Sequence, residues 1–144
     1  MAVYHKLLKN KAGDTIIPVT QEVYSTSEQA VGQWVDGRAL YRKTVQIPKS
    51  LWVAGPTADE YEASLSSFNL PTASGRILLV DAAHSYLLRS SGTIVQTGTV
   101  SLNSPSYTFS FRGVTSANNL QAGIGSTLYS QYSDMWVTFI YTKN

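Results

Sequence analysis

The chain has 144 residues, no cysteine, a net charge of +2, and charged side chains at only 14% of its positions. Its length is enough for one domain to bury a core without disulfides or metals, and the lack of cysteine excludes disulfides, thiolate catalysis and thiolate metal sites. No apolar run approaches the roughly 20 residues of a membrane helix, so we expect no membrane insertion. A net charge of +2 is too small to indicate a nucleic-acid partner.

The first 20 residues differ from the rest of the chain. They are basic, they are interrupted at Lys11–Asp14, and they lack sustained alternation of polar and apolar residues. We therefore predict an N-terminal attachment arm at residues 1–20 and a separate folded module at residues 21–144. Ser25 and Glu28 follow with the spacing of a capping box, which predicts a short helical turn near residues 25–31 that ends at Gly32.

A hairpin is predicted next. Asp36-Gly37 is a strong signal for a tight type I′ turn between Trp34-Val35 and the segment that follows. The stretch Ala39–Ile47 alternates between two sets of side chains, as a strand does.

The remainder of the chain is rich in residues that favour strands, in short runs separated by turns. Thr57–Ala63 could be a short helix or an acidic loop. Seven to eight short strands predict an all-β fold, an antiparallel β-sandwich or jelly-roll-like arrangement. The further strand candidates are Arg76–Leu88, Thr93–Leu102, Tyr107–Phe111 and Met135–Thr142, with Ser64–Leu70 and Ser126–Tyr132 as weaker ones.

The C-terminal half is unusually poor in charge. From Arg89 onward the only charged residues are Arg89, Arg112, Asp134 and Lys143, although a soluble monomer normally keeps its surface charged. This pattern favours a surface that faces a neighbouring subunit. The alternative is a Ser/Thr-rich surface without a partner.

Catalytic groups are scarce. His84 has Asp81 and Ser85 nearby in the sequence, but neighbours on one extended run point to alternating faces, so a Ser-His-Asp arrangement is not expected there. Asp59, Glu60 and Glu62 are the only grouped carboxylates that could serve glycoside hydrolysis, and a solvated acidic loop is the favoured explanation for them. No pattern typical of a metal or cofactor site is present. We expect no enzymatic activity.

Aromatic side chains are the remaining source of binding chemistry. Tyrosine and tryptophan offer a flat apolar face together with a polar group, which suits contacts with sugars and with proteins. On this basis we predict binding of a glycan or a protein partner at Trp52, Tyr129, Gln131 and Tyr132. The alternative is that these rings belong to the core.

The segment Tyr24–Val45 reads YSTSEQAVGQWVDGRALYRKTV. It resembles a motif of bacteriophage tail-fibre, baseplate and receptor-binding-type structural proteins, and the C-terminal MWVTFIYTKN resembles their closing strand. We predict that the motif has a structural role. Its most informative residues are Tyr24, Glu28, Trp34, Asp36, Gly37 and Tyr41.

The resemblance implies a virion structural protein in a phage tail, fibre tip or other appendage. It further implies a homotrimer, attachment to other virion proteins through residues 1–20, and a face that could contact a host-surface saccharide. Three alternatives stay open: a stand-alone glycan-binding β-sandwich, a head-fibre or decoration protein of the capsid, and a small glycan-degrading enzyme.

Overall fold

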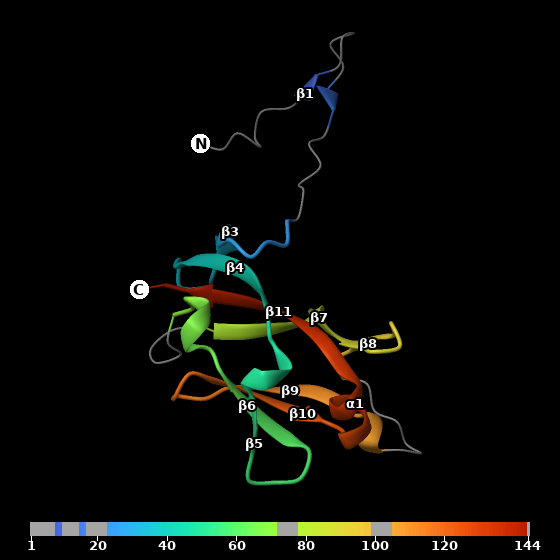
Figure 1. The fold of residues 1–144 in the computed structure, drawn as a ribbon. Coiled ribbons are helices and arrows are strands. Elements are labelled where there is room, and N and C mark those ends of the chain that lie inside the picture. The colour runs from blue at the N-terminus through green and yellow to red at the C-terminus, as the bar shows by residue number, and fades with distance from the viewer. Residues whose placement is uncertain (1–7, 10–14, 17–22, 72–77, 99–104, 144) are drawn as a thin grey trace.

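The protein is described by a computed structural model that covers residues 8–9, 15–16, 23–71, 78–98 and 105–143. Two antiparallel sheets face each other as a β-sandwich (Figure 1), which confirms the predicted fold class. The strands are β1 Leu8–Lys9, β2 Thr15–Ile16, β3 Gln29–Gln33, β4 Ala39–Gln46, β5 Trp52–Ala54, β6 Glu60–Ser64, β7 Leu78–Arg89, β8 Ile94–Gln96, β9 Phe109–Val114, β10 Asn119–Ile124 and β11 Tyr132–Thr142, and the helix is α1 Ser126–Gln131.

The first sheet has five strands in the order β3-β4-β11-β7-β8, and the second has four in the order β5-β6-β10-β9. In the part of the chain that the structure describes, nine strands therefore build the sandwich, somewhat more than the seven to eight predicted. The β1 and β2 strands pair only with each other. They are all that the structure describes of the predicted arm at residues 1–20, the rest of which lies outside the described residues.

The β11 strand is the centre of the five-stranded sheet, between β4 and β7. Its sequence alternates as a strand with one buried face must. Met135, Val137, Phe139 and Tyr141 all point inward and are fully buried. From the opposite sheet they meet buried side chains that include Ala63, Phe109, Leu120, Ala122 and Ile124.

The predicted hairpin joins β3 to β4, but its turn is of another type. Trp34 and Arg38 close the loop through the bond from the Trp34 N–H to the Arg38 C=O, at 2.8 Å. Gly37 has φ +87°, whereas Asp36 is not among the residues with positive φ. A three-residue loop with a left-handed glycine, a common alternative to type I′, accounts for this pattern.

The predicted helical turn at residues 25–31 is wrong, because residues 29–33 form β3. The Ser25 hydroxyl accepts a hydrogen bond from the N–H of Ser27, at 3.0 Å, and so closes a serine turn. Strand β4 then provides backbone partners for the segment that follows, beginning with Gln29 opposite Arg42. A capping box stabilises a helix because it satisfies backbone N–H groups at the helix start. Here strand β4 satisfies backbone groups of this segment instead, so the capping-box residues do not start a helix.

Three further segments differ from the prediction. Residues 126–131 form helix α1, although Ser126–Tyr132 was a weak strand candidate. Ser64–Leu70 contains a 3₁₀ turn at Ser66–Phe68. The acidic stretch Thr57–Ala63 is neither a helix nor a free loop, since it enters β6 at Glu60.

Candidate functional site

The motif at Tyr24–Val45 and the closing strand form one structural unit. Glu28, just before β3, accepts a hydrogen bond from the Tyr141 hydroxyl at 2.6 Å and a second one from the Lys143 ammonium. The Lys143 ammonium also lies 4.5 Å from the centre of the Tyr41 ring, which stacks on Tyr141. The two segments of the sequence that carry the resemblance are thus joined in three dimensions.

The ionisation of Glu28 follows from these contacts. Partial burial by itself would raise the pKa of the carboxyl, but the hydrogen bonds from Lys143 and Tyr141 outweigh it and lower the pKa below its ordinary value. Burial and the bond to Glu28 raise the pKa of the Tyr141 hydroxyl, which keeps it a neutral donor. The contact is therefore an ionised carboxylate held by two donors.

A second group of motif residues lies on the outer face of the five-stranded sheet. Arg42 is buried, donates to the Val23 carbonyl at 2.7 Å, and holds its guanidinium 4.3 Å from the centre of the Tyr24 ring. The ring of Tyr24 lies 4.9 Å from that of His84. The chain before β3 is therefore folded against this face, with Tyr24 between a cation and an imidazole.

Strand β7 contains a large bulge on the same face. Asp81 pairs with Thr138 and Tyr86 with Trp136, so the four residues 82–85 lie opposite the single residue Val137. Such a bulge frees backbone groups from the sheet, and those groups need other partners when they are buried.

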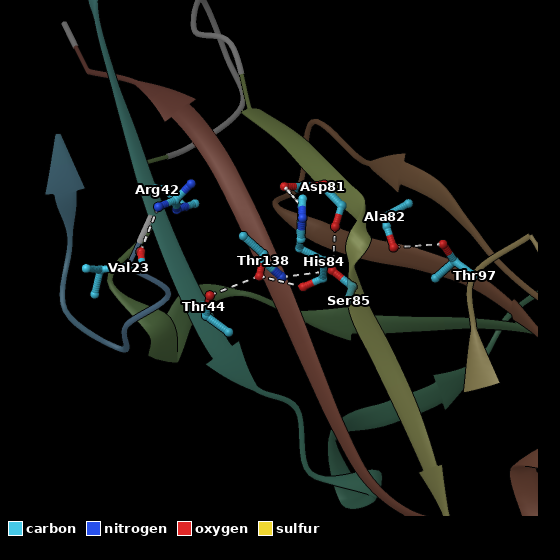
Figure 2. A network of polar contacts seen from close by, with 9 residues as sticks. All are labelled: Val23, Arg42, Thr44, Asp81, Ala82, His84, Ser85, Thr97 and Thr138. Atoms are coloured by element: carbon cyan, nitrogen blue, oxygen red, sulfur yellow. Dashed lines mark hydrogen bonds and ion pairs between the residues drawn. The ribbon is translucent and has the colours of Figure 1, made fainter. Parts of the chain in front are cut away.

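Hydroxyl groups supply these partners (Figure 2). The Ser85 hydroxyl donates to the Asp81 carbonyl at 2.7 Å and accepts from the Thr138 N–H at 2.9 Å. The Thr138 hydroxyl donates to the His84 carbonyl at 2.7 Å and lies 2.9 Å from the Thr44 hydroxyl. Thr97 donates to the Ala82 carbonyl at 3.1 Å. The bulge is consequently held in one shape by side chains of β7 itself, of β11 and of the turn after β8, and Thr44 of β4 supports Thr138.

The bulge also brings Asp81 and His84 together. His84 Nδ1 lies 2.8 Å from Asp81 Oδ2, which corrects the expectation that these two residues point to opposite faces. Ser85 does not join them, because its hydroxyl is buried and bonds to the backbone. What the bulge presents to solvent is an imidazole oriented by a carboxylate, without an adjacent nucleophile.

Beside the bulge lies a pocket of about 350 Å³. Aromatic rings, amide and hydroxyl groups line it, and its lining within the described part of the chain contains no Asp, Glu, Lys or Arg side chain. The lining residues are Tyr24, Thr44, Ala83, His84, Ser85, Tyr86, Ile94, Gln96, Trp136 and Thr138. Tyr24 and Thr44 belong to the motif segment, His84 and Ser85 are residues considered only for catalysis, and Trp136 and Thr138 lie in the closing strand. None of the lining residues was predicted to bind a ligand.

A signal for part of the pocket does exist in the sequence. Because Met135 and Val137 point into the core, Trp136 must point to the opposite face of β11, where its ring can line a surface. Tyr86, which pairs with Trp136, lies on that face too. The bulge in β7 beside the pocket, by contrast, could not be predicted from any pattern in the sequence.

The four residues predicted to bind a glycan or partner lie elsewhere, near α1. Trp52 and Tyr132 are buried; the Trp52 indole N–H donates to the Tyr132 hydroxyl at 3.2 Å, and this hydroxyl donates to the Ile47 carbonyl. These two rings have no exposed face on which a saccharide could stack, so their assignment as binding residues is corrected to a core role.

Tyr129 and Gln131 are accessible in part. The Tyr129 ring stacks on Tyr61 with a centroid distance of 4.2 Å, and the Lys49 ammonium lies 4.8 Å from its centre. Gln131 accepts a hydrogen bond from Arg89 at 2.7 Å. Binding at these two residues stays a prediction.

Two of the three grouped acids are engaged by neighbouring side chains. Glu62 accepts hydrogen bonds from Gln121 at 2.8 Å and Asn119 at 3.3 Å, and Glu60 accepts one from Thr57. Among the described residues there is no group of three or more His, Asp or Glu side chains that could hold a metal ion. In the same part of the chain, no helix has the length and apolar character needed to cross a membrane.

No protein-family model, curated protein or solved structure matches this chain. The function therefore has to be argued from the motif, the fold and the pocket.

Proposed function

We propose that this chain is a non-catalytic structural protein of a bacteriophage particle, in the tail, a fibre tip or another appendage, and that it assembles as a homotrimer. The observation that carries the proposal is the contact between the two segments that resemble phage structural proteins. Glu28 of the first segment binds Tyr141 and Lys143 of the second. Residues that recur together in a family for structural reasons are expected to touch in this way.

Exposed apolar residues at the sheet edges support self-association. Strand β3 is an edge strand without a charged residue, and Val31 within it and Val35 in the following turn are 40% and 92% exposed. On the other sheet, Val53 of edge strand β5 is 67% exposed. Free edges are normally protected by charges or proline, so these features favour a protein partner that covers the edge.

The trimer is tested by multi-angle light scattering on the purified chain. We expect the mass of three chains, and we expect Val35→Lys to shift the mass toward one chain. Ser116→Lys, in an exposed turn, is the matched control and should leave the mass unchanged. A single-chain mass at high concentration would contradict the trimer.

The location is tested by labelling purified phage particles with an antibody against the chain. Label on a tail or appendage is the expected result, whereas label on the capsid surface would favour a head-fibre or decoration protein. A chain that lacks residues 1–20 should still fold but should no longer be incorporated into particles if this arm is the attachment device.

A stand-alone glycan-binding module is the second candidate, and the pocket beside the β7 bulge favours it. This candidate predicts that the chain is absent from purified particles. The labelling experiment therefore separates the two functions.

A further inference from the structure

We propose that the pocket beside the β7 bulge is a binding site for one or two rings of a neutral saccharide. This inference goes beyond the structural role, because the pocket lies within a single chain. Its volume of about 350 Å³ is at the lower end of the range of about 300–1,000 Å³ found for small-ligand sites. Such a pocket suits a terminal sugar and is too small for a long chain of sugars.

The walls have the chemistry that a sugar requires. Tyr86 and Trp136 provide aromatic rings, whose faces carry partial negative charge and attract the weakly positive C–H groups of a pyranose face. Thr44, His84 and Gln96 provide groups that can exchange hydrogen bonds with hydroxyls. This mixture of aromatic and polar groups suits an amphipathic ligand better than a purely apolar one.

The charge of the pocket indicates a neutral ligand. Among the residues that the structure describes, no Asp, Glu, Lys or Arg side chain lines it, and the nearby Asp81 carboxylate is engaged by His84. Arg42, the nearest motif cation, is buried and directed at Val23 and Tyr24. An anionic sugar or a phosphate would find no free counter-charge here.

The site is also held in shape before a ligand arrives. Asp81 fixes the His84 ring through Nδ1, and among the residues that the structure describes Nε2 has no hydrogen-bond partner. The Thr138 and Ser85 hydroxyls hold the backbone of the bulge that carries His84. Preorganisation of this kind reduces the entropy lost on binding.

The experiment is saturation-transfer NMR and calorimetry on the full chain. The probes are the methyl glycosides of glucose, galactose, mannose and N-acetylglucosamine, with glucuronate as a charged comparison. We expect at least one neutral glycoside to bind with a Kd on the order of 1 mM, the weak affinity typical of a small open site. Glucuronate should bind more weakly than the glucoside.

Variants locate the site. His84→Ala and Gln96→Ala should each weaken binding by about tenfold, a loss that matches one or two hydrogen bonds. Ser116→Ala, in an exposed turn, is the matched control and should leave the affinity unchanged. Tyr129→Ala tests the other aromatic cluster as an alternative site. Thermal unfolding of each variant shows whether the fold is retained.

Three outcomes would overturn the proposal. The first is that no neutral glycoside binds the native chain. The second is that Tyr129→Ala abolishes binding while His84→Ala does not, which would place the site near α1. The third is that His84→Ala and Gln96→Ala dissociate a native oligomer, which would make this face a subunit interface. None of these outcomes depends on whether the chain is found in phage particles.

Discussion

Tyr141 donates its hydroxyl to the carboxylate of Glu28 across 113 positions of sequence, at 2.6 Å. The pair joins the segment before β3 to the end of β11, with β4 between the two strands. Lys143 adds a second donor to the same carboxylate. This contact closes one end of the five-stranded sheet, so the stability of that end should depend on it.

Tyr141→Phe removes the hydroxyl and retains the buried ring. We expect the free energy of unfolding to fall by about 1.5–3 kcal/mol, the range for a hydrogen bond to a charged group. Urea denaturation followed by circular dichroism measures this change. Tyr129→Phe is the control, since its ring stacks on Tyr61 but its hydroxyl has no part in the Glu28 contact; an equal loss in both variants would contradict the prediction.

The contribution of Glu28 should depend on pH. Its pKa is lowered in the folded protein from an ordinary value of 4.5, so its stabilising effect is present above pH 4.5 and is lost as the pH falls through the folded-state pKa. Glu28→Gln, which does not titrate, should be less stable than the native chain at pH 7 by about 1 kcal/mol, a modest value for a partly exposed pair. The difference should shrink below pH 4.5.

Urea denaturation of the native chain and Glu28→Gln at pH 7 and at pH 3 checks this prediction. The quantity compared is the difference in the free energy of unfolding between the two proteins at each pH. The contributions of the other titrating groups are the same in both proteins and therefore cancel. A difference that is equal at both pH values would show that the carboxylate does not act through its charge.

Thr138→Val should destabilise the bulge of β7. Thr138 is fully buried, and valine retains its shape while removing the hydroxyl that bonds to the His84 carbonyl and the Thr44 hydroxyl. Leaving a buried carbonyl without its partner is expected to lower the free energy of unfolding by about 1–3 kcal/mol. Thr93→Val, at an exposed turn, should change it by less than about 0.5 kcal/mol, and calorimetric melts of both variants decide the matter.

Gly37 should tolerate asparagine better than alanine. Its φ is +87°, and no atom lies within 4 Å of the position that a Cβ would occupy. A side chain at this position would therefore lower the stability through backbone strain and not through a steric clash. Alanine should destabilise the hairpin by about 1–2 kcal/mol, and asparagine by less, because it adopts left-handed backbone more readily. Equal stability of the two variants in thermal melts would contradict this explanation.

Trp52→Phe distinguishes a core role from a binding role. Loss of the indole N–H that donates to the Tyr132 hydroxyl, together with the smaller ring, should lower the free energy of unfolding by about 1–3 kcal/mol. Saccharide binding, measured by the same NMR titration as for the pocket variants, should be unchanged. A stable variant that no longer binds glycosides would restore Trp52 as a binding residue.

Much of the architecture could be predicted because its signals are local. The alternation of Met135–Thr142 specifies a strand with one buried face, and Asp36-Gly37 specifies a reversal of the chain. In both cases the residues that decide the structure are adjacent in sequence. The candidate site is different, because the His84 imidazole, the Trp136 indole and the Gln96 amide come from three strands and meet only after β7 and β11 have paired around a bulge.

The sequence by itself determined that this chain is an antiparallel sandwich whose strands have one apolar face, since side-chain alternation is set residue by residue. Only the tertiary structure decided the state of the short ambiguous segments and the exposure of the aromatic rings. Gln29–Gln33 is a strand because β4 offers it backbone partners, and residues 126–131, which pair with none of the described strands, form a helix. Trp52 is buried because residues far along the chain cover it, and those neighbours exist only once the two sheets have packed.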